Sequence, residues 1–158
     1  MQYLIDEPII QTLVKGISLL PLTTLKVVSE GDLSLLPSPE SLDEWLDAVL
    51  IKFNHYKSEK TLGNTWNLTE YFMEIWVIRH YSYEEPDMDK NTREFTKTIC
   101  EYLMCCPDIL NLSSNRLTFK EVVVEKVYFD NDVDTMFKAN GVKATAVNIK
   151  YKITTQSN

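Results

Sequence analysis

The sequence predicts an α+β domain with a mostly antiparallel sheet, built from two long β-hairpins, with two α-helices packed on one face. Two pairs of β-rich segments flank an amphipathic helical segment, and a second helical segment precedes both pairs. The chain has 158 residues, of which 44% are hydrophobic and 25% are charged. This length and composition are typical of a single globular domain over residues 1–158.

The N-terminal elements follow from hydrophobic spacing and from residues that break regular structure. From about Asp6 to Leu20, hydrophobic residues recur at helical spacing, and the proline that follows ends the helix. The segment Thr23–Ser29 is rich in β-branched residues and predicts a short strand. Ser41 and Glu44 fit a capping box for a short helix. A strand already running by Leu46 is the open alternative.

Two hairpins form the predicted sheet. In the first, a strand from about Ala48 to Lys57 turns through Glu59–Thr65 into a longer strand, Trp66–Tyr83, in the middle of the sheet. In the second, Leu117–Phe129 pairs with Val142–Thr155, whose hydrophobic and polar residues alternate.

A helix connects the two predicted hairpins. Asp87 or Asp89 caps its first turn, where a negative charge is favourable, and Pro107 stops it. Its hydrophobic residues, among them Phe95 and Ile99, form one stripe that can cover a sheet face.

The segment Tyr71–Tyr81, YFMEIWVIRHY, is hydrophobic on both faces of its predicted strand. Two helices can cover one face, so we expect another copy of the chain to cover the second. Head-to-tail contacts of this kind close into a ring when the rotation permits. The loops Lys57–Trp66 and Asp130–Asn140 are longer than a hairpin needs and are expected to make contacts. The candidate residues of an interface with another subunit or with a partner protein are Trp66, Phe72, Trp76, Ile78, Leu62, Met136 and Phe137.

No catalytic or cofactor-binding motif is recognisable in the sequence. Only four glycines are present, and none forms a phosphate-binding loop. His55 and His80 lie on adjacent predicted strands, and Asp47 could approach His80 across the hairpin. A histidine–carboxylate pair can serve as a general base, but no nucleophile motif accompanies it. We interpret it as a structural pair.

The potential metal ligands lack the spacing of a metal site. Cys100, Cys105 and Cys106 do not match a zinc motif, and we interpret them as small buried hydrophobic residues. The acidic run Asp130–Asp134 lacks the glycine and the glutamate that a calcium loop has at its sixth and twelfth positions. We therefore expect no metal and no cofactor.

The charge and hydropathy of the chain disfavour two classes of partner. The net charge of −7 argues against binding nucleic acid through its phosphates, which requires clustered Lys and Arg. No run approaches the roughly 20 apolar residues that span a bilayer.

The order helix, strand, long hairpin, helix, long hairpin resembles the tail terminator, or tail completion, proteins of long-tailed bacteriophages. The resemblance runs from the helix at Pro8-Ile9-Ile10 to the closing strand GVKATAVNIKYKITT, with NLTEYFMEIWVIRHY and the helix after it between them. It implies a structural protein, not an enzyme, located in the virion tail or neck and assembled in the host cytoplasm. Such proteins form a hexameric ring that caps the tail tube protein, ends elongation and docks the head connector protein. DNA would pass through an acidic bore without sequence-specific binding.

Two alternatives remain open. The chain could form another neck or tail tube ring of a phage. From a different class, it could be a small monomeric enzyme or ligand-binding domain that uses the region of His55 and His80. This second alternative requires a concave pocket around a perturbed histidine.

Overall fold

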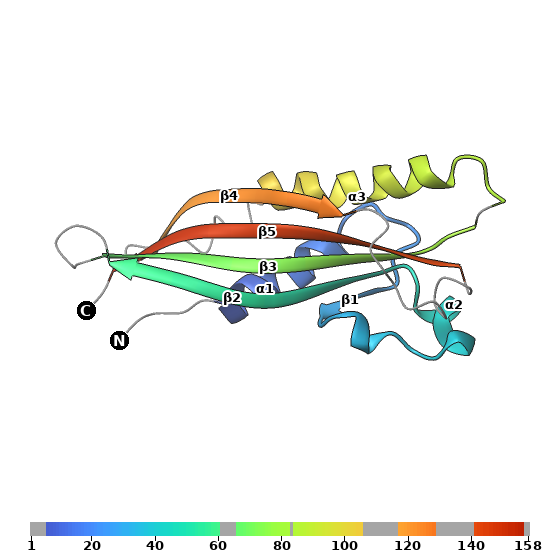
Figure 1. The fold of residues 1–158 in the computed structure, drawn as a ribbon, viewed down its shortest axis with the longest axis horizontal. Coiled ribbons are helices and arrows are strands. Elements are labelled where there is room, and N and C mark those ends of the chain that lie inside the picture. The colour runs from blue at the N-terminus through green and yellow to red at the C-terminus, as the bar shows by residue number, and fades with distance from the viewer. Residues whose placement is uncertain (1–5, 61–65, 83, 106–116, 129–140, 157–158) are drawn as a thin grey trace.

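The computed structural model describes residues 6–60, 66–82, 84–105, 117–128 and 141–156, and it has an α+β fold (Figure 1). A five-stranded, mostly antiparallel sheet carries two long helices on one face. The elements are α1 (Asp6–Ser18), β1 (Val27–Glu30), η1 (Leu33–Leu35), η2 (Pro39–Ser41), α2 (Leu42–Trp45), β2 (Ala48–Lys60), β3 (Trp66–His80), α3 (Met88–Cys105), β4 (Leu117–Tyr128) and β5 (Val142–Gln156). The predicted fold class is confirmed.

The strands lie in the order β1-β2-β3-β5-β4. β2–β3 and β4–β5 are the two predicted antiparallel hairpins, and β3 pairs with β5 along its whole length. β1 is parallel to β2 and pairs only with Ala48–Ile51, which places the strand slightly later in the sequence than Thr23–Ser29. The sheet therefore ends in a four-residue strand on one side and in the twelve-residue β4 on the other.

The larger core lies between one face of the sheet and the two long helices. Each large aliphatic or aromatic side chain fully buried here stabilises the fold by about 1.5–3 kcal/mol. The buried members from α1, α3 and β3 are Ile9, Ile10, Leu13, Ile17, Phe95, Ile99, Leu103, Tyr71, Met73, Ile75 and Val77. These β3 residues alternate along the strand, so α1 and α3 cover the same face.

A smaller second core covers the opposite face at one end of the sheet. Leu42 and Leu46, from the segment between β1 and β2, pack with Ile78 and with neighbouring residues of β2 and β5. Figure 1 shows β1 and α2 at this end. The chain here covers its own second face, so the two-sided hydrophobicity of Tyr71–Tyr81 does not by itself require another copy.

Two local predictions need correction. The Ser41–Glu44 capping box is wrong, because the Ser41 side chain makes no capping hydrogen bond to α2. α2 has only four residues, and its C-cap Leu46 already has an extended backbone, which leads directly into β2. β2 continues to Lys60, so only residues 61–65 separate it from β3, which is an ordinary hairpin length. Those residues and 129–140 lie outside the described part of the chain.

Candidate functional site

Four of the seven predicted interface residues cannot be placed as side chains. Leu62, Met136 and Phe137 lie outside the described residues. Trp66 is the first residue of β3, and its side chain also lies outside them. The structure thus locates three of the predicted residues, all on the second face of β3.

Trp76 and Ile78 belong to the second core of this chain. Ile78 has 0% of its surface exposed, so it offers no surface to a neighbouring molecule. Trp76 is half-buried and packs against the same cluster. Its indole Nε1 is buried and has no hydrogen-bond partner among the described residues.

Phe72 lies farther along the second face, where polar side chains replace the apolar cluster. Its ring stacks on His55, with centroids 4.4 Å apart, and Lys150 Nζ lies 5.7 Å from the ring centroid on the neighbouring strand. Lys150 also pairs with Glu70 at 3.2 Å and with Glu125 at 3.3 Å. The hydrogen bond to Glu70, reinforced by Glu125, raises the pKa of Lys150. Phe72 is therefore held in a polar, partly solvated setting.

Charges of alternating sign form a row across this polar half of the second face. The register aligns Lys57 of β2 with Glu70 of β3, Glu70 with Lys152 of β5, and Lys152 with Glu121 of β4. Lys152 and Glu121 form an ion pair at 3.4 Å. Because opposite charges on adjacent strands attract, the row favours this register and keeps the face compatible with water. The row begins with a lysine on one side of the sheet and ends with a glutamate on the other.

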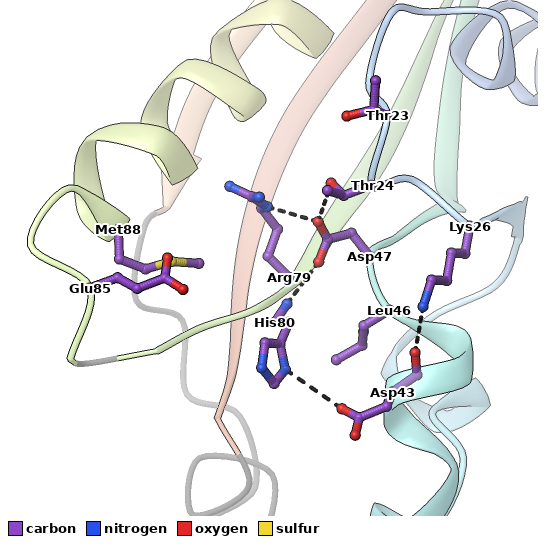
Figure 2. A pocket seen from close by; sticks show the side chains of 10 residues that line it. All are labelled: Thr23, Thr24, Lys26, Asp43, Leu46, Asp47, Arg79, His80, Glu85 and Met88. Carbon is purple, nitrogen blue, oxygen red and sulfur yellow. Dashed lines mark hydrogen bonds and ion pairs between the residues drawn. The ribbon is translucent and has the colours of Figure 1, made fainter.

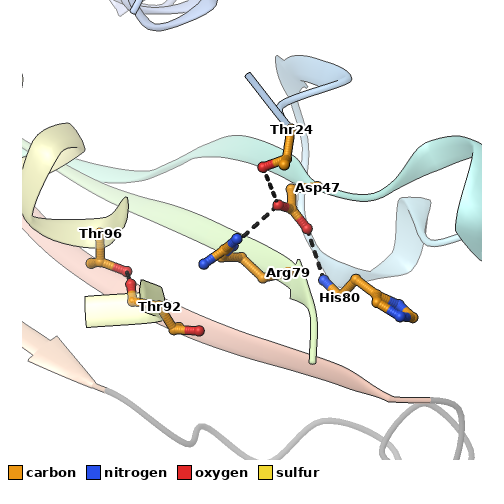
Figure 3. Close-up of polar contacts among 6 residues, drawn as sticks. All are labelled: Thr24, Asp47, Arg79, His80, Thr92 and Thr96. Atoms are coloured by element: carbon orange, nitrogen blue, oxygen red, sulfur yellow. Dashed lines mark hydrogen bonds and ion pairs between the residues drawn. The ribbon is translucent and has the colours of Figure 1, made fainter. Parts of the chain in front are cut away.

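A buried carboxylate organises the opposite end of the sheet. Asp47, 3% exposed, accepts hydrogen bonds from Thr24 Oγ1 at 2.6 Å, Arg79 Nε at 3.1 Å and the backbone N–H of His80 at 2.8 Å (Figure 3). The first bond comes from the segment before β1 and the other two come from the end of β3. Asp47 therefore ties three segments together. Its contact with His80 is with the backbone N–H and not with the imidazole ring.

Arg79 completes this cluster on the side of α3. Its guanidinium carbon lies 4.4 Å from the ring centroid of Phe95, so the cation rests on an aromatic face. Its Nη1 is buried without a hydrogen-bond partner among the described residues, as are the hydroxyls of Thr92 and Thr145. Sequence reasoning missed Arg79. The sequence signal for a buried cationic partner was Asp47, an acidic residue that directly precedes the buried strand residues Ala48–Ile51.

A half-open pocket of about 520 Å³ adjoins this cluster (Figure 2). Its lining residues are Thr23, Thr24, Lys26, Asp43, Leu46, Asp47, Arg79, His80, Glu85 and Met88. The pocket contains charges of both signs, and two of them, Asp47 and Arg79, form an ion pair. Lys26 donates to the backbone carbonyl of Asp43, and His80 Nδ1 lies 3.9 Å from the Asp43 carboxylate. The hydroxyl groups in the lining are those of Thr23 and Thr24, and Thr24 Oγ1 donates to Asp47.

The two histidines do not meet. His55 is opposite Phe72 in the β2–β3 register, eight residues before His80 on β3. At about 3.3 Å per residue, this places them roughly 26 Å apart along the sheet. His55 and His80 therefore do not belong to one site.

Cysteines and carboxylates are likewise dispersed. Within the described ranges, no group of three or more His, Cys, Asp or Glu residues could hold a metal ion. Cys100 is half-buried, and burial raises the pKa of its thiol, with a further contribution from Glu101. Cys105 is exposed, which corrects its interpretation as a buried residue, and Cys106 lies outside the described residues.

A final polar contact joins the start of α3 to the sheet. The Tyr81 hydroxyl donates to Asp89 at 2.6 Å, and Lys143 Nζ donates to the same carboxylate oxygen at 3.0 Å. These two hydrogen bonds lower the pKa of Asp89. α3 begins at Met88, directly after Asp87, and Asp89 lies in its first turn.

No helix in the part of the chain that the structure describes is both long enough and apolar enough to cross a membrane.

No protein-family model matches the chain, and no curated protein is significantly similar to it. Function is therefore proposed from the residues and the fold.

Proposed function

We propose that this chain is a structural protein of a phage virion, a ring-forming tail terminator. In this role it caps the tail tube protein, ends elongation and presents a docking surface to the head connector protein. The observation that supports it best is the sheet itself: four long antiparallel strands, of which β2 over part of its length and β4 along its outer side pair with no further strand among the described residues. Such a sheet can be extended by further copies. The order of the elements also agrees with the resemblance.

The mechanism relies on shape and on charge. One face of a closed ring matches the last ring of tail tube subunits, and subunit addition stops because the opposite face has a different surface. The net charge of −7 weakens any contact with DNA phosphates, so DNA can pass the ring without being held. This role requires no bound group and no catalytic residues.

The test is tube growth. The tail tube protein of the same phage is assembled in the presence of this chain, and tube lengths are measured by negative-stain microscopy. We expect shorter tubes, with additional density at one end only. Lys97→Ala, which changes an exposed residue of α3, serves as the control and should cap equally well. Tubes of unchanged length with bare ends would rule out a terminator.

The pocket beside Asp47 and Arg79 supports a second candidate, a small ligand-binding domain. Its volume of about 520 Å³ falls within the range of ligand sites, and it contains polar groups from three segments of the chain. Screening polar metabolites by thermal shift tests this candidate. A ligand that stabilises the parent protein but not His80→Ala or Asp43→Ala would favour it over the ring.

A further inference from the structure

Two backbone edges of the sheet meet no other strand in the part of the chain that the structure describes. β1 pairs with β2 only at Ala48–Ile51, and no other described strand pairs with the outer edge of β2 from about Asn54 to Lys60. β4 pairs with β5 on one side and is the outermost strand on the other. Figure 1 shows β2 and β4 on opposite sides of β3 and β5. Unpaired N–H and C=O groups along such edges are templates for pairing with another chain.

The two edges differ in charge on the second face. The alternating row described above begins with Lys57 on β2 and ends with Glu121 on β4. Both side chains are exposed, and Lys57 makes no ion pair with a described residue. If the β4 edge of one copy meets the β2 edge of the next, Glu121 faces Lys57, and the alternation continues across the boundary. Two β2 edges would instead bring lysine to lysine, and two β4 edges glutamate to glutamate.

The same edges also match on the first face. The next row contains Tyr56 of β2, Tyr71 of β3, Tyr151 of β5 and Val122 of β4. Tyr56 is 44% exposed although its ring lies 6.4 Å from that of the buried Tyr71, and Val122 is half-buried. An aromatic residue opposite a β-branched residue is a favourable cross-strand pair. The pair Tyr56–Val122 would bury apolar surface that a lone subunit leaves in water.

Strand direction permits this contact. Each of the pairs β2–β3, β3–β5 and β5–β4 is antiparallel, so β2 and β4 run in opposite directions within one sheet. A second copy in the same orientation therefore places its β4 antiparallel to β2. Bulges after Phe119 and after Val124 interrupt β4, which leaves Glu121–Val124 as a regular stretch. Bulges on exposed edges suppress indiscriminate pairing, so a short and defined register remains.

We propose that the β4 edge of one copy pairs antiparallel with the free β2 edge of the next, with Glu121 opposite Lys57 and Val122 opposite Tyr56. The contact is head-to-tail, because unlike edges meet, and it extends the sheet from copy to copy until the ring closes. This inference deepens the proposed function and rests on its ring.

Disulfide trapping tests the register directly. Tyr56→Cys and Val122→Cys are introduced together into a chain whose three native cysteines are serine. Within one chain the two positions are three strand spacings apart, about 14 Å, which is too far for a disulfide. Every bond between them must therefore join two copies. On oxidation we expect a ladder of covalent oligomers from the double variant and only monomer from either single variant.

Charge reversal gives a second test that keeps the native cysteines. Lys57→Glu alone sets two glutamates against each other at the boundary, and Glu121→Lys alone sets two lysines. Each should weaken self-association roughly tenfold or more. Mixing the two variants restores opposite charges at every boundary of an alternating ring, so association should return. Denaturation curves for both variants establish that each remains folded.

The outcomes separate this inference from the proposed function. A dimer from Tyr56→Cys alone would mean that like edges pair, which overturns the inference. Assembly detected by light scattering without any ladder, and without rescue on mixing, overturns the edge contact and leaves the ring in place. A parent protein that stays monomeric at every concentration overturns both. A ladder from a protein that does not cap tubes supports the edge contact and contradicts the terminator.

Discussion

Removing the Asp47 carboxylate is the change with the largest predicted effect on stability. The side chain is 4% exposed and accepts three hydrogen bonds, one of them from Arg79, whose side chain is 11% exposed. In Asp47→Ala, the arginine keeps its charge in a mostly buried setting, and Thr24 Oγ1 and the His80 N–H lose their acceptor. Breaking a buried ion pair in this way costs about 3–5 kcal/mol.

The effect is measurable by urea denaturation and by thermal melting. For a chain of this length, 1 kcal/mol corresponds to about 2–4 °C, so the melting temperature should fall by roughly 6–20 °C. Asp43→Ala is the matched control: this carboxylate is exposed and lies 3.9 Å from His80, and its loss should change stability by less than about 0.5 kcal/mol.

A second substitution tests the cause of the loss. Arg79→Met keeps an unbranched side chain beside Phe95 and removes the buried charge. Added to Asp47→Ala, it should recover part of the lost free energy of unfolding, because the uncompensated cation is gone. If Asp47→Ala unfolds within about 1 kcal/mol of the parent, Asp47 does not tie these segments together and the reasoning fails.

Three further predictions concern other parts of the fold. Ile78→Ala should destabilise the chain by about 2–5 kcal/mol, whereas Leu19→Ala, at a residue 75% exposed, should change little; equal effects would remove Ile78 from the second core. Gly16→Ala should destabilise despite the better helix propensity of alanine, because the new Cβ would lie 1.5 Å from the Tyr102 hydroxyl, and the sign should reverse in Tyr102→Ala. With the other cysteines changed to serine, Cys100 should be alkylated slowly, with a rate that rises only above the usual pKa of a thiol. Its raised pKa means that this thiol contributes stability below the unfolded pKa, and that the contribution is lost as the pH rises through the folded value.

The long elements could be predicted because their patterns are local. The alternation of Val142–Thr155 and the helical spacing of Phe95 and Ile99 need no knowledge of partners, and both elements formed as expected. Segments with weak periodicity were harder. Leu42 and Leu46 carry too short a pattern to reveal that their segment covers the second face.

The candidate site was less accessible to sequence reasoning. Asp47 drew notice for its position near His80, but its partners Thr24 and Arg79 come from segments 23 and 32 residues away. Nothing local in the sequence links them. The row of alternating charges could not be predicted from the sequence either. The alternation of Lys57, Glu70, Lys152 and Glu121 becomes visible only once three strand registers are known.

The central claim is that this chain closes into a ring, and negative-stain microscopy of the purified protein tests it most directly. Class averages should show closed rings with a central opening, and light scattering on the same sample should give a mass close to six times that of the 18.3 kDa chain. The particles should dissociate in Lys57→Glu and reappear when it is mixed with Glu121→Lys. Particles of monomer mass without an opening, at every concentration and in the presence of tail tubes, would contradict the account.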